Sequence, residues 1–348
     1  MKKTLLTGMA LFTLLSASAQ KEPVDYVNPF IGTTNYGTTN PGALCPQGMM
    51  SVTPFNVMGD APENKINKDK TWWSTPYEFN NKYLTGFAHV NLSGVGCPEL
   101  GSLLLMPTTG ELNVDYQNYG SVYSQEAATP GYYTNKLDKY GIKCELTATP
   151  RTSLARFTFP AGQGNILMNL GEGLTNESGA TVRFVNDREI EGVKTLGTFC
   201  YVPDAVFPIY FVMRINKVPA ERGVWKMMRP MDVEAQWDNT AGKYKLYKGY
   251  SKQMSGDDVG AWFSFNTTEN EVVEVSVGVS FVSIENARLN LEKEQPFGTT
   301  FEKLRAEARN KWNEDLKRIS VKGGTEDQKS VFYTAMYHTL IHPNILQD

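Results

Sequence analysis

The spacing of apolar residues changes near residue 285, and this change constrains the fold more than any other feature of the sequence. Over residues 272–284, apolar positions alternate with polar or small ones, the apolar set being Val273, Val275, Val277, Val279 and Phe281. A period of two is typical of a β-strand with one buried face. Over residues 299–319, apolar side chains recur every three or four positions, which predicts a helix. The chain is therefore expected to form a β domain followed by helices.

The region before the change, residues 22–285, carries many short apolar runs separated by turn-forming residues. Runs at 154–159 and 165–170 flank a Pro- and Gly-containing turn at 160–164. Another run covers 205–215, where Pro208 predicts an edge strand or a bulge. Many short strands joined by turns predict a β-sandwich rather than βαβ units.

Two helices are predicted after residue 285. Thr299 with Glu302, and Thr325 with Gln328, each fit a capping box at a helix beginning. The second helix ends before Pro343, and little sequence follows it. One helix cannot build an all-helical core, so it either packs back on the β domain or begins a helical domain. We favour the second alternative.

The first 19 residues have the features of a cleavable export signal. Lys2 and Lys3 precede an apolar run at 5–15, and the small residues 17–19 form a cleavage site before Gln20. The run is shorter than the ~20 residues of a membrane span, and no later stretch resembles one. No cysteine lies at the cleavage point, which disfavours a lipid anchor. The expected location is the periplasm or the exterior.

Composition excludes some functions. The formal net charge of −3 gives no basic excess for binding nucleic acid. Export permits disulfides, and the four cysteines allow three complete pairings. Their wide spacing disfavours a zinc or redox motif, and we favour buried free thiols at Cys45, Cys97, Cys144 and Cys200.

Familiar catalytic motifs are absent from the sequence. His338 and His342 have the i, i+4 spacing that can chelate zinc, but Thr339 stands where a metalloprotease has glutamate. A packing or hydrogen-bonding role at the helix end is therefore expected for both histidines. Gly94-Val95-Gly96 is followed by Glu99 where a dinucleotide-binding loop needs a third glycine.

Residues 71–101 are the segment best suited to hold a ligand. Trp72 and Trp73 lie in a polar context, and residues 86–94 place His89 and Asn91 in a Gly-flanked loop. Sugars need apolar faces against their C–H groups and polar groups around their hydroxyls. Neighbouring residues of a strand point to opposite faces, so at most one of the two tryptophans is expected to meet a ligand.

Eight segments of the chain, in order, match a known family. They are VNPFIGT (27–33), PGA (41–43), GFAHVNLSGVG (86–96), PGYY (130–133), YGIKCELTAT (140–149), SIENA (283–287), FYTAMYH (332–338) and HPN (342–344). With these segments the chain resembles the N-terminal part of glycoside hydrolase family 92, the calcium-dependent exo-acting α-mannosidases.

The resemblance implies a fold. It is an all-β supersandwich of the galactose-mutarotase-like kind, then linker helices and an (α/α)6 barrel. On this sequence the parts are a signal peptide at 1–19, the β-sandwich domain at 20–285, a helical linker at 286–324 and the start of the barrel at 325–348. The sequence is expected to stop just inside the barrel.

The resemblance also implies a reaction. The family hydrolyses mannose-containing glycans with inversion, using one carboxylic acid and one carboxylate on opposite sides of the bond. Calcium is implied as the cofactor that helps distort the mannose. The acid, the base and most calcium ligands belong to the barrel, so no catalytic or metal residue is assigned here. The chain alone is expected to be inactive, with the remaining catalytic domain as its partner.

What the resemblance carries over to this chain is the rim of the sugar pocket. The candidates are Gly32, Thr33, Trp72, Trp73, His89 and Asp348. Ala88, Asn91 and the Pro98-Glu99 pair depart from the usual family pattern, which leaves the linkage preference open. In the alternative interpretation, His89 and Asn91 satisfy hydrogen bonds inside the β domain.

Two other functions fit the same sequence. The sandwich and Trp72 and Trp73 are compatible with a stand-alone carbohydrate-binding module. The last helix is compatible with a structural domain that recruits a partner through an apolar face.

Overall fold

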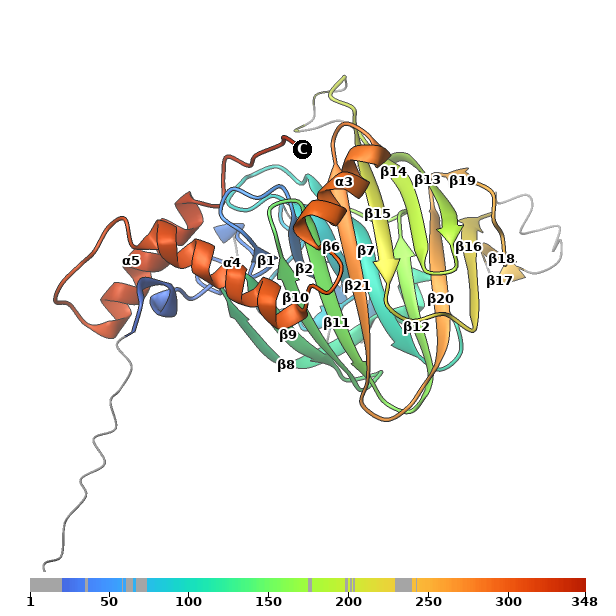
Figure 1. Ribbon diagram of the computed structural model, residues 1–348, viewed down its shortest axis with the longest axis horizontal. Coiled ribbons are helices and arrows are strands. Elements are labelled where there is room, and N and C mark those ends of the chain that lie inside the picture. The colour runs from blue at the N-terminus through green and yellow to red at the C-terminus, as the bar shows by residue number, and fades with distance from the viewer. Residues whose placement is uncertain are drawn as a thin grey trace, which may run out of the picture.

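The computed structural model describes residues 21–34, 37–57, 59–60, 65–66, 74–174, 177–197, 200, 202, 204–228, 240–241 and 243–348. Within these residues, two stacked antiparallel sheets are followed by helices (Figure 1). This architecture confirms the predicted β-sandwich and the change to helices near residue 285.

The first sheet has nine strands among the described residues. In spatial order they are β1 (Ala43–Leu44), β2 (Ser51–Phe55), β6 (Gly86–Asn91), β7 (Leu100–Thr109), β12 (Gly162–Asn169), β20 (Val259–Thr267), β16 (Glu221–Met227), β18 (Tyr244–Lys248) and β17 (Thr240–Ala241). A separate hairpin pairs β3 (Gly59–Asp60) with β4 (Lys65–Ile66). The short helices η1 (Pro23–Tyr26) and α1 (Tyr116–Tyr119) lie outside the sheets.

The second sheet has ten strands among the described residues. In spatial order they are β19 (Met254–Gly256), β13 (Glu177–Asn186), β14 (Glu189–Leu196), β15 (Phe207–Ile215), β21 (Glu271–Ser280), β11 (Thr152–Phe159), β10 (Ile142–Ala148), β9 (Tyr132–Leu137), β8 (Ser121–Thr129) and β5 (Tyr83–Leu84). The two runs predicted at 154–159 and 165–170 are β11 and β12, and the turn between them carries the chain from one sheet to the other.

The core lies between the two sheets. The alternating valines of β21 are fully buried: Val273, Val275, Val277 and Val279. Trp225 of β16 and Trp262 of β20 are also fully buried, from the first sheet. The period-two pattern therefore correctly predicted which face of β21 enters the core.

The expectation of an edge strand or bulge at Pro208 was wrong. β15 pairs with β14 on one side and with β21 on the other. The pairing with β21 begins only at Tyr210, so Pro208 lies beyond it. Proline lacks a backbone N–H, and this position does not need one toward β21.

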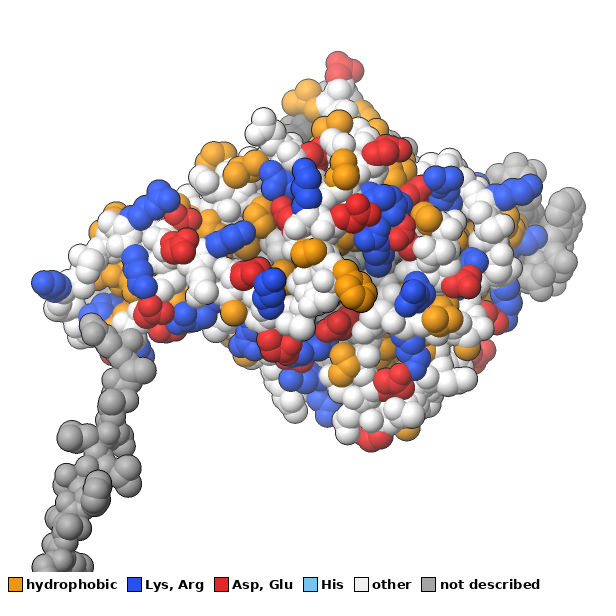
Figure 2. Space-filling model, in the orientation of Figure 1, with side chains coloured by type: hydrophobic (Ala, Val, Ile, Leu, Met, Phe, Trp, Pro, Cys, Tyr) orange, Lys and Arg blue, Asp and Glu red, His pale blue; other side chains and the backbone are white. Residues whose placement is uncertain are grey.

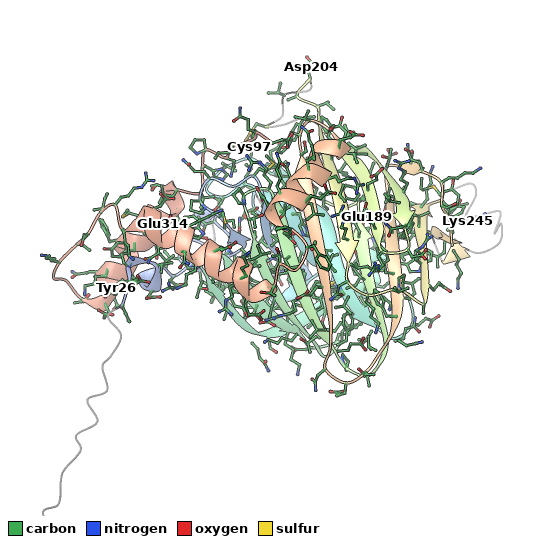
Figure 3. All side chains as sticks on the ribbon, viewed as in Figure 1. Tyr26, Cys97, Glu189, Asp204, Lys245 and Glu314 are labelled. Atoms are coloured by element: carbon green, nitrogen blue, oxygen red, sulfur yellow. A yellow bond between two sulfur atoms is a disulfide. The ribbon has the colours of Figure 1, made fainter. Side chains whose placement is uncertain are left out.

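Helix α3 (Ile284–Glu294) covers the outer face of the second sheet. Arg288 of this helix bonds to Glu189 and to Glu191, two nearly buried carboxylates on β14 (Figure 3). Gly278 of β21 lets the helix come close, because a Cβ there would lie 2.6 Å from Ala287 O. The ion pairs and the missing side chain together hold α3 on the sheet.

Helix α4 (Phe301–Leu316) packs against β10 and β9 of the second sheet. Its N-cap is Thr300, whose hydroxyl accepts from Lys303 N, so the prediction of Thr299 was wrong by one residue. At the β8–β9 turn, Gly131 has φ +81°, and a Cβ there would lie 2.6 Å from the Ala308 Cβ. Glycine is needed there both for the backbone conformation and for the approach of the helix.

Helix α5 (Glu326–Thr339) packs on α4 and η1. Its buried face consists of Tyr333, Thr334 and Tyr337, while Val331 is 61% exposed. The helix thus packs back on the rest of the chain and also keeps an exposed apolar side chain. None of the described helices is long and apolar enough to cross a membrane.

The capping box predicted at Thr325 is confirmed. Its hydroxyl accepts from Gln328 N, and the Gln328 side chain accepts from Thr325 N. Thr325→Ala should lower the free energy of unfolding by about 1 kcal/mol, because one backbone donor loses its acceptor. Urea unfolding followed by far-UV circular dichroism measures the change. Ser330→Ala, within the same helix, is the control and should stay within about 0.5 kcal/mol of the parent.

Candidate functional site

Three segments meet at the β1–β2–β6 end of the first sheet, and we call them the rim loops. They are residues 31–40, of which 35 and 36 lie outside the described residues, residues 92–99, and residues 338–348. Gly94 N donates to Thr38 O at 2.8 Å, which joins the first two segments. Ser93 N donates to His342 Nε2 at 3.0 Å, which joins the last two. The sequence predictions at Gly32, Thr33 and Asp348 all fall in these loops.

Gly32 and Thr33 form a tight turn within the first rim loop. Gly32 has φ +83°, and a Cβ there would lie 3.0 Å from Thr39 Oγ1 and 3.7 Å from His338 Cε1. Thr33 is buried, and its hydroxyl donates to Phe30 O at 2.7 Å. In this geometry the Thr33 hydroxyl holds the turn together, and the small Gly32 lets the last helix approach.

His89 lies inside the sheet and not at the rim. It is fully buried on β6, and its Nδ1 donates to Leu103 O at 2.8 Å. Desolvation lowers the pKa of His89 to about 4, so the ring is neutral near pH 7. The Asn91 amide donates to Ser51 O at 3.0 Å and to Ala88 O at 2.9 Å. These contacts match the alternative in which both residues serve the β domain.

Trp72 and Trp73 lie outside the described residues. The described chain resumes at Ser74, which is buried. Contact of either tryptophan with a sugar therefore stays a prediction.

Asp348 is held by the β-sandwich and α3. Its carboxylate accepts from Ser280 Oγ at 2.8 Å, Asn286 Nδ2 at 2.8 Å and Asn290 Nδ2 at 2.7 Å. Arg151 Nε donates to the neighbouring carbonyl of Gln347 at 2.6 Å. Figure 1 shows the C-terminus beside the beginning of α3. The carboxylate is thus occupied with anchoring the last rim loop.

In the sequence, Glu99 is notable only because it departs from the family pattern. In the structure, it is the buried acid of the rim loops. Its side chain is 1% exposed, and Oε1 accepts from Cys200 N. Oε2 has no hydrogen-bond partner among the described residues. Burial raises the pKa of Glu99, and the bond from Cys200 N offsets part of this effect. The sequence signal that could have identified Glu99 is its position after a Gly-rich loop and a cysteine.

The preference for four free thiols was wrong. Cys97 and Cys200 form a disulfide, although 103 residues separate them, while Cys45 and Cys144 are buried free thiols. Cys97 lies in the rim loops (Figure 3), and its bond ties them to the segment that follows β14. Burial raises the pKa of Cys45 to about 12, so this thiol is inert at neutral pH. Spacing along the sequence could not reveal a pairing that only the sheet order creates.

No group of three or more His, Cys, Asp or Glu side chains that could hold a metal ion occurs in the described part of the chain. Burial lowers the pKa of both His338 and His342, and His342 Nε2 accepts from Ser93 N. His342 therefore has the packing and hydrogen-bonding role expected for it.

The rim loops gather polar groups, and one of their two acids is already committed to hydrogen bonds within the chain. Inverting hydrolysis needs two carboxyl groups ~6.5–9.5 Å apart, one to protonate the leaving oxygen and one to activate water. The described rim loops contain two acids, Glu99 and Asp348, and Asp348 is held by three side-chain donors.

Comparison with known families matches both parts of the chain. The N-terminal domain of glycosyl hydrolase family 92 matches residues 26–280, and the catalytic domain of the same family matches residues 286–348. A secreted glycosidase of Arthroderma benhamiae is 26% identical over 366 residues, which cover 98% of this chain and 44% of that protein.

Solved structures give the same result. A family GH92 α-mannosidase from Bacteroides thetaiotaomicron superposes with a TM-score of 0.81 at 30% identity, covering 94% of this chain and 42% of that chain. Its complex with mannoimidazole gives a TM-score of 0.80 over 94% of this chain and 41% of that one, again at 30% identity. A GH92 inverting mannosidase from the same species shares the fold, with a TM-score of 0.72 at 23% identity over 93% of this chain and 40% of that one.

The chain thus spans less than half the length of these relatives. The family match extends over the sandwich, α3, α4 and α5, and includes all three rim loops. On this evidence the chain belongs to glycoside hydrolase family 92.

Proposed function

We propose that this chain is the β-sandwich part of an exported α-mannosidase that hydrolyses mannose-containing glycans. The observation that carries the proposal is its 30% identity, over 94% of its length, to a family GH92 α-mannosidase, which is also known in complex with mannoimidazole. The rim loops support the same assignment, because they gather polar groups and a buried acid at one end of a rigid sheet.

In this proposal the chain supplies part of the pocket wall, and the reaction is carried out elsewhere. The acid and the base are supplied by sequence beyond residue 348, which the longer relatives have. Glu99 is buried beneath the rim loops, with one oxygen bonded to Cys200 N, so its role in this proposal is to hold the pocket wall in place and not to contact the sugar.

Calcium, which the family resemblance implies, does not fit the described residues as a resident ion. Calcium takes six to eight oxygen ligands, commonly from several carboxylates. The described residues offer no cluster of three acids, and Asp348 already accepts three hydrogen bonds. We propose that its ligands lie mostly outside this chain, and no step of the reaction is assigned to it here.

Export to the periplasm or the exterior is part of the proposal. The export signal at 1–19 lies outside the described residues. A disulfide between Cys97 and Cys200 and the printed name of the secreted fungal relative both support an oxidising compartment.

The purified chain, beginning at Gln20, should release no mannose from α-mannobiosides, because in this proposal the acid and the base are not among its residues. Mannose release is measured by a coupled assay with added calcium and again with a chelator. The Bacteroides thetaiotaomicron α-mannosidase, assayed in parallel, shows that the substrate and the assay are sound. Sustained, calcium-dependent release by the purified chain would show that the catalytic pair is within these 348 residues.

A further inference from the structure

A pocket lies on the outer face of the second sheet between α3 and α4, and none of its lining residues belongs to the rim loops. It has a volume of about 270 Å³. Its floor comes from β11, β15 and β21, and one wall is the loop at 295–299 that joins the two helices. Figure 2 shows apolar side chains exposed on this face beside acidic and basic ones.

Strand register places polar groups on the floor. Ser276 on β21 is paired with Leu154 on one side and with Arg214 on the other. Two residues along the strand, Glu274 N donates to Asn216 Oδ1 at 2.9 Å, and Asn216 N donates to Glu274 O at 3.1 Å. Because alternate residues of a strand share a face, Glu274 and Ser276 both project outward into the pocket.

Glu274 is an available acceptor in this pocket. The residue is half-buried, and its carboxylate takes no hydrogen bond or ion pair from another described residue. Burial raises the pKa of Glu274, while Arg156 opposes the rise. Ser276 Oγ and Asn216 Nδ2 likewise have no partner among the described residues. The floor therefore offers a carboxylate, a hydroxyl and an amide to a ligand.

Phe297 stands on the rim of the same pocket with its ring fully exposed, at 109% relative exposure. Pro296 precedes it, and Gly298 with φ +84° follows, so the turn restricts where the ring can go. A large apolar ring that nothing covers is unfavourable in water and suits a ligand with an apolar face.

The charges around the pocket favour a neutral ligand. Arg214 is paired with Glu189 at 2.5 Å and with Glu292 at 3.2 Å, and Arg156 is paired with Glu145 and Glu302. An anion would find both guanidinium groups already neutralised. A cation would meet Glu274 with those same two arginines close by. An uncharged group with several hydroxyls meets neither obstacle.

We propose that this pocket binds a single neutral sugar ring, at a site separate from the rim loops. The C–H face of a pyranose stacks on Phe297, and its hydroxyls donate to Glu274 and exchange hydrogen bonds with Ser276 and Asn216. The volume is near the lower end for small-molecule sites, which fits one ring and not a long chain. The inference does not depend on the proposed hydrolysis, since the pocket shares no residue with the rim loops.

The test is a titration of the isotopically labelled chain with methyl α-D-mannopyranoside, followed by NMR chemical-shift changes. Shifts are expected at 274–276 and 295–299, with weak, saturable binding. Phe297→Ala should weaken binding about tenfold, the equivalent of losing one stacking face. Phe297→Trp should retain it, and Glu274→Gln should weaken it by a similar factor, since an amide accepts less strongly than a carboxylate.

The control is Val218→Ala, which removes another exposed apolar side chain outside the pocket and should leave binding unchanged. Because Phe297 is fully exposed, its replacement should not alter the fold, and the dispersed NMR spectrum verifies this. The inference is overturned if the shifts map to the rim loops, if Phe297→Ala binds like the parent chain, or if the sugar causes no shifts at all.

Discussion

Replacing Trp312 by alanine should lower the free energy of unfolding by about 3–5 kcal/mol, the usual cost of removing a large buried ring. Trp312 on α4 is fully buried, its ring centroid lies 4.3 Å from that of Tyr337 on α5, and its Nε1 donates to Leu44 O at 2.7 Å. The substitution therefore leaves a cavity where α4, α5 and β1 meet. It also leaves the Leu44 carbonyl without its partner.

Urea unfolding, followed by far-UV circular dichroism, measures the loss. Trp312→Phe should cost less, because it keeps one aromatic ring in the contact while losing the hydrogen bond and the second ring. The control is Val331→Ala on α5, where the side chain is 61% exposed and the change should stay within about 0.5 kcal/mol. If Trp312→Ala destabilises no more than this control, the two helices do not dock on the sandwich through Trp312.

Acidification from pH 7 to pH 4 should remove about 3 kcal/mol of stability through His89 alone. Its folded pKa of about 4 is below the unfolded value near 6.5. Above pH 6.5 the ring is neutral in both states and contributes no pH dependence. Between pH 6.5 and 4 the unfolded chain binds a proton that the folded chain does not, so stability falls as the pH falls.

The physical reason is the environment of the second ring nitrogen. Nδ1 donates to Leu103 O, whereas Nε2 is buried with no partner among the described residues. A proton on Nε2 would be a buried donor without an acceptor. His89→Asn keeps a donor near the position of Nδ1 and cannot titrate, so it should flatten the acid side of the stability curve.

The measurement is a series of urea unfolding curves from pH 4 to pH 8 on the parent chain and on His89→Asn. Part of the slope should survive in the variant, because burial also lowers the pKa of His338 and His342. Identical slopes for the two proteins between pH 6.5 and 4 would mean that His89 is protonated in the folded state, contrary to its burial.

The sequence correctly predicted features that depend only on residues close together along the chain. The alternating valines of β21 and the capping box at Thr325 were both confirmed. The failures involve contacts between distant segments. Pro208 led us to expect an edge strand, but β15 lies between β14 and β21 in a sheet order that the sequence does not reveal. Cys97 and Cys200 were expected to be free because nothing near either residue indicates the other.

The sequence named candidate positions but not the contacts that they make. Gly32 and Thr33 lie in a rim loop that contacts residues 92–99, whereas Asp348 is bonded to β21 and α3, and a sugar-binding role for all three stays a prediction. In the structure, the Thr33 hydroxyl donates to Phe30 O, and the Asp348 carboxylate accepts from side chains of α3 and β21. Neither the spacing of apolar residues nor a sequence motif could reveal these partners. Glu99 became a candidate only when its burial was known.

The contact between the beginning of the described chain and α5 can form only late in biosynthesis. Asn28 N donates to Thr334 Oγ1, a partner 306 residues later, and Val24 and Val27 belong to the same apolar cluster as Trp312 and Tyr337. At the usual ribosomal pace, about 15–60 s pass between the emergence of the two sides. Throughout that interval the early valines have no surface to cover them.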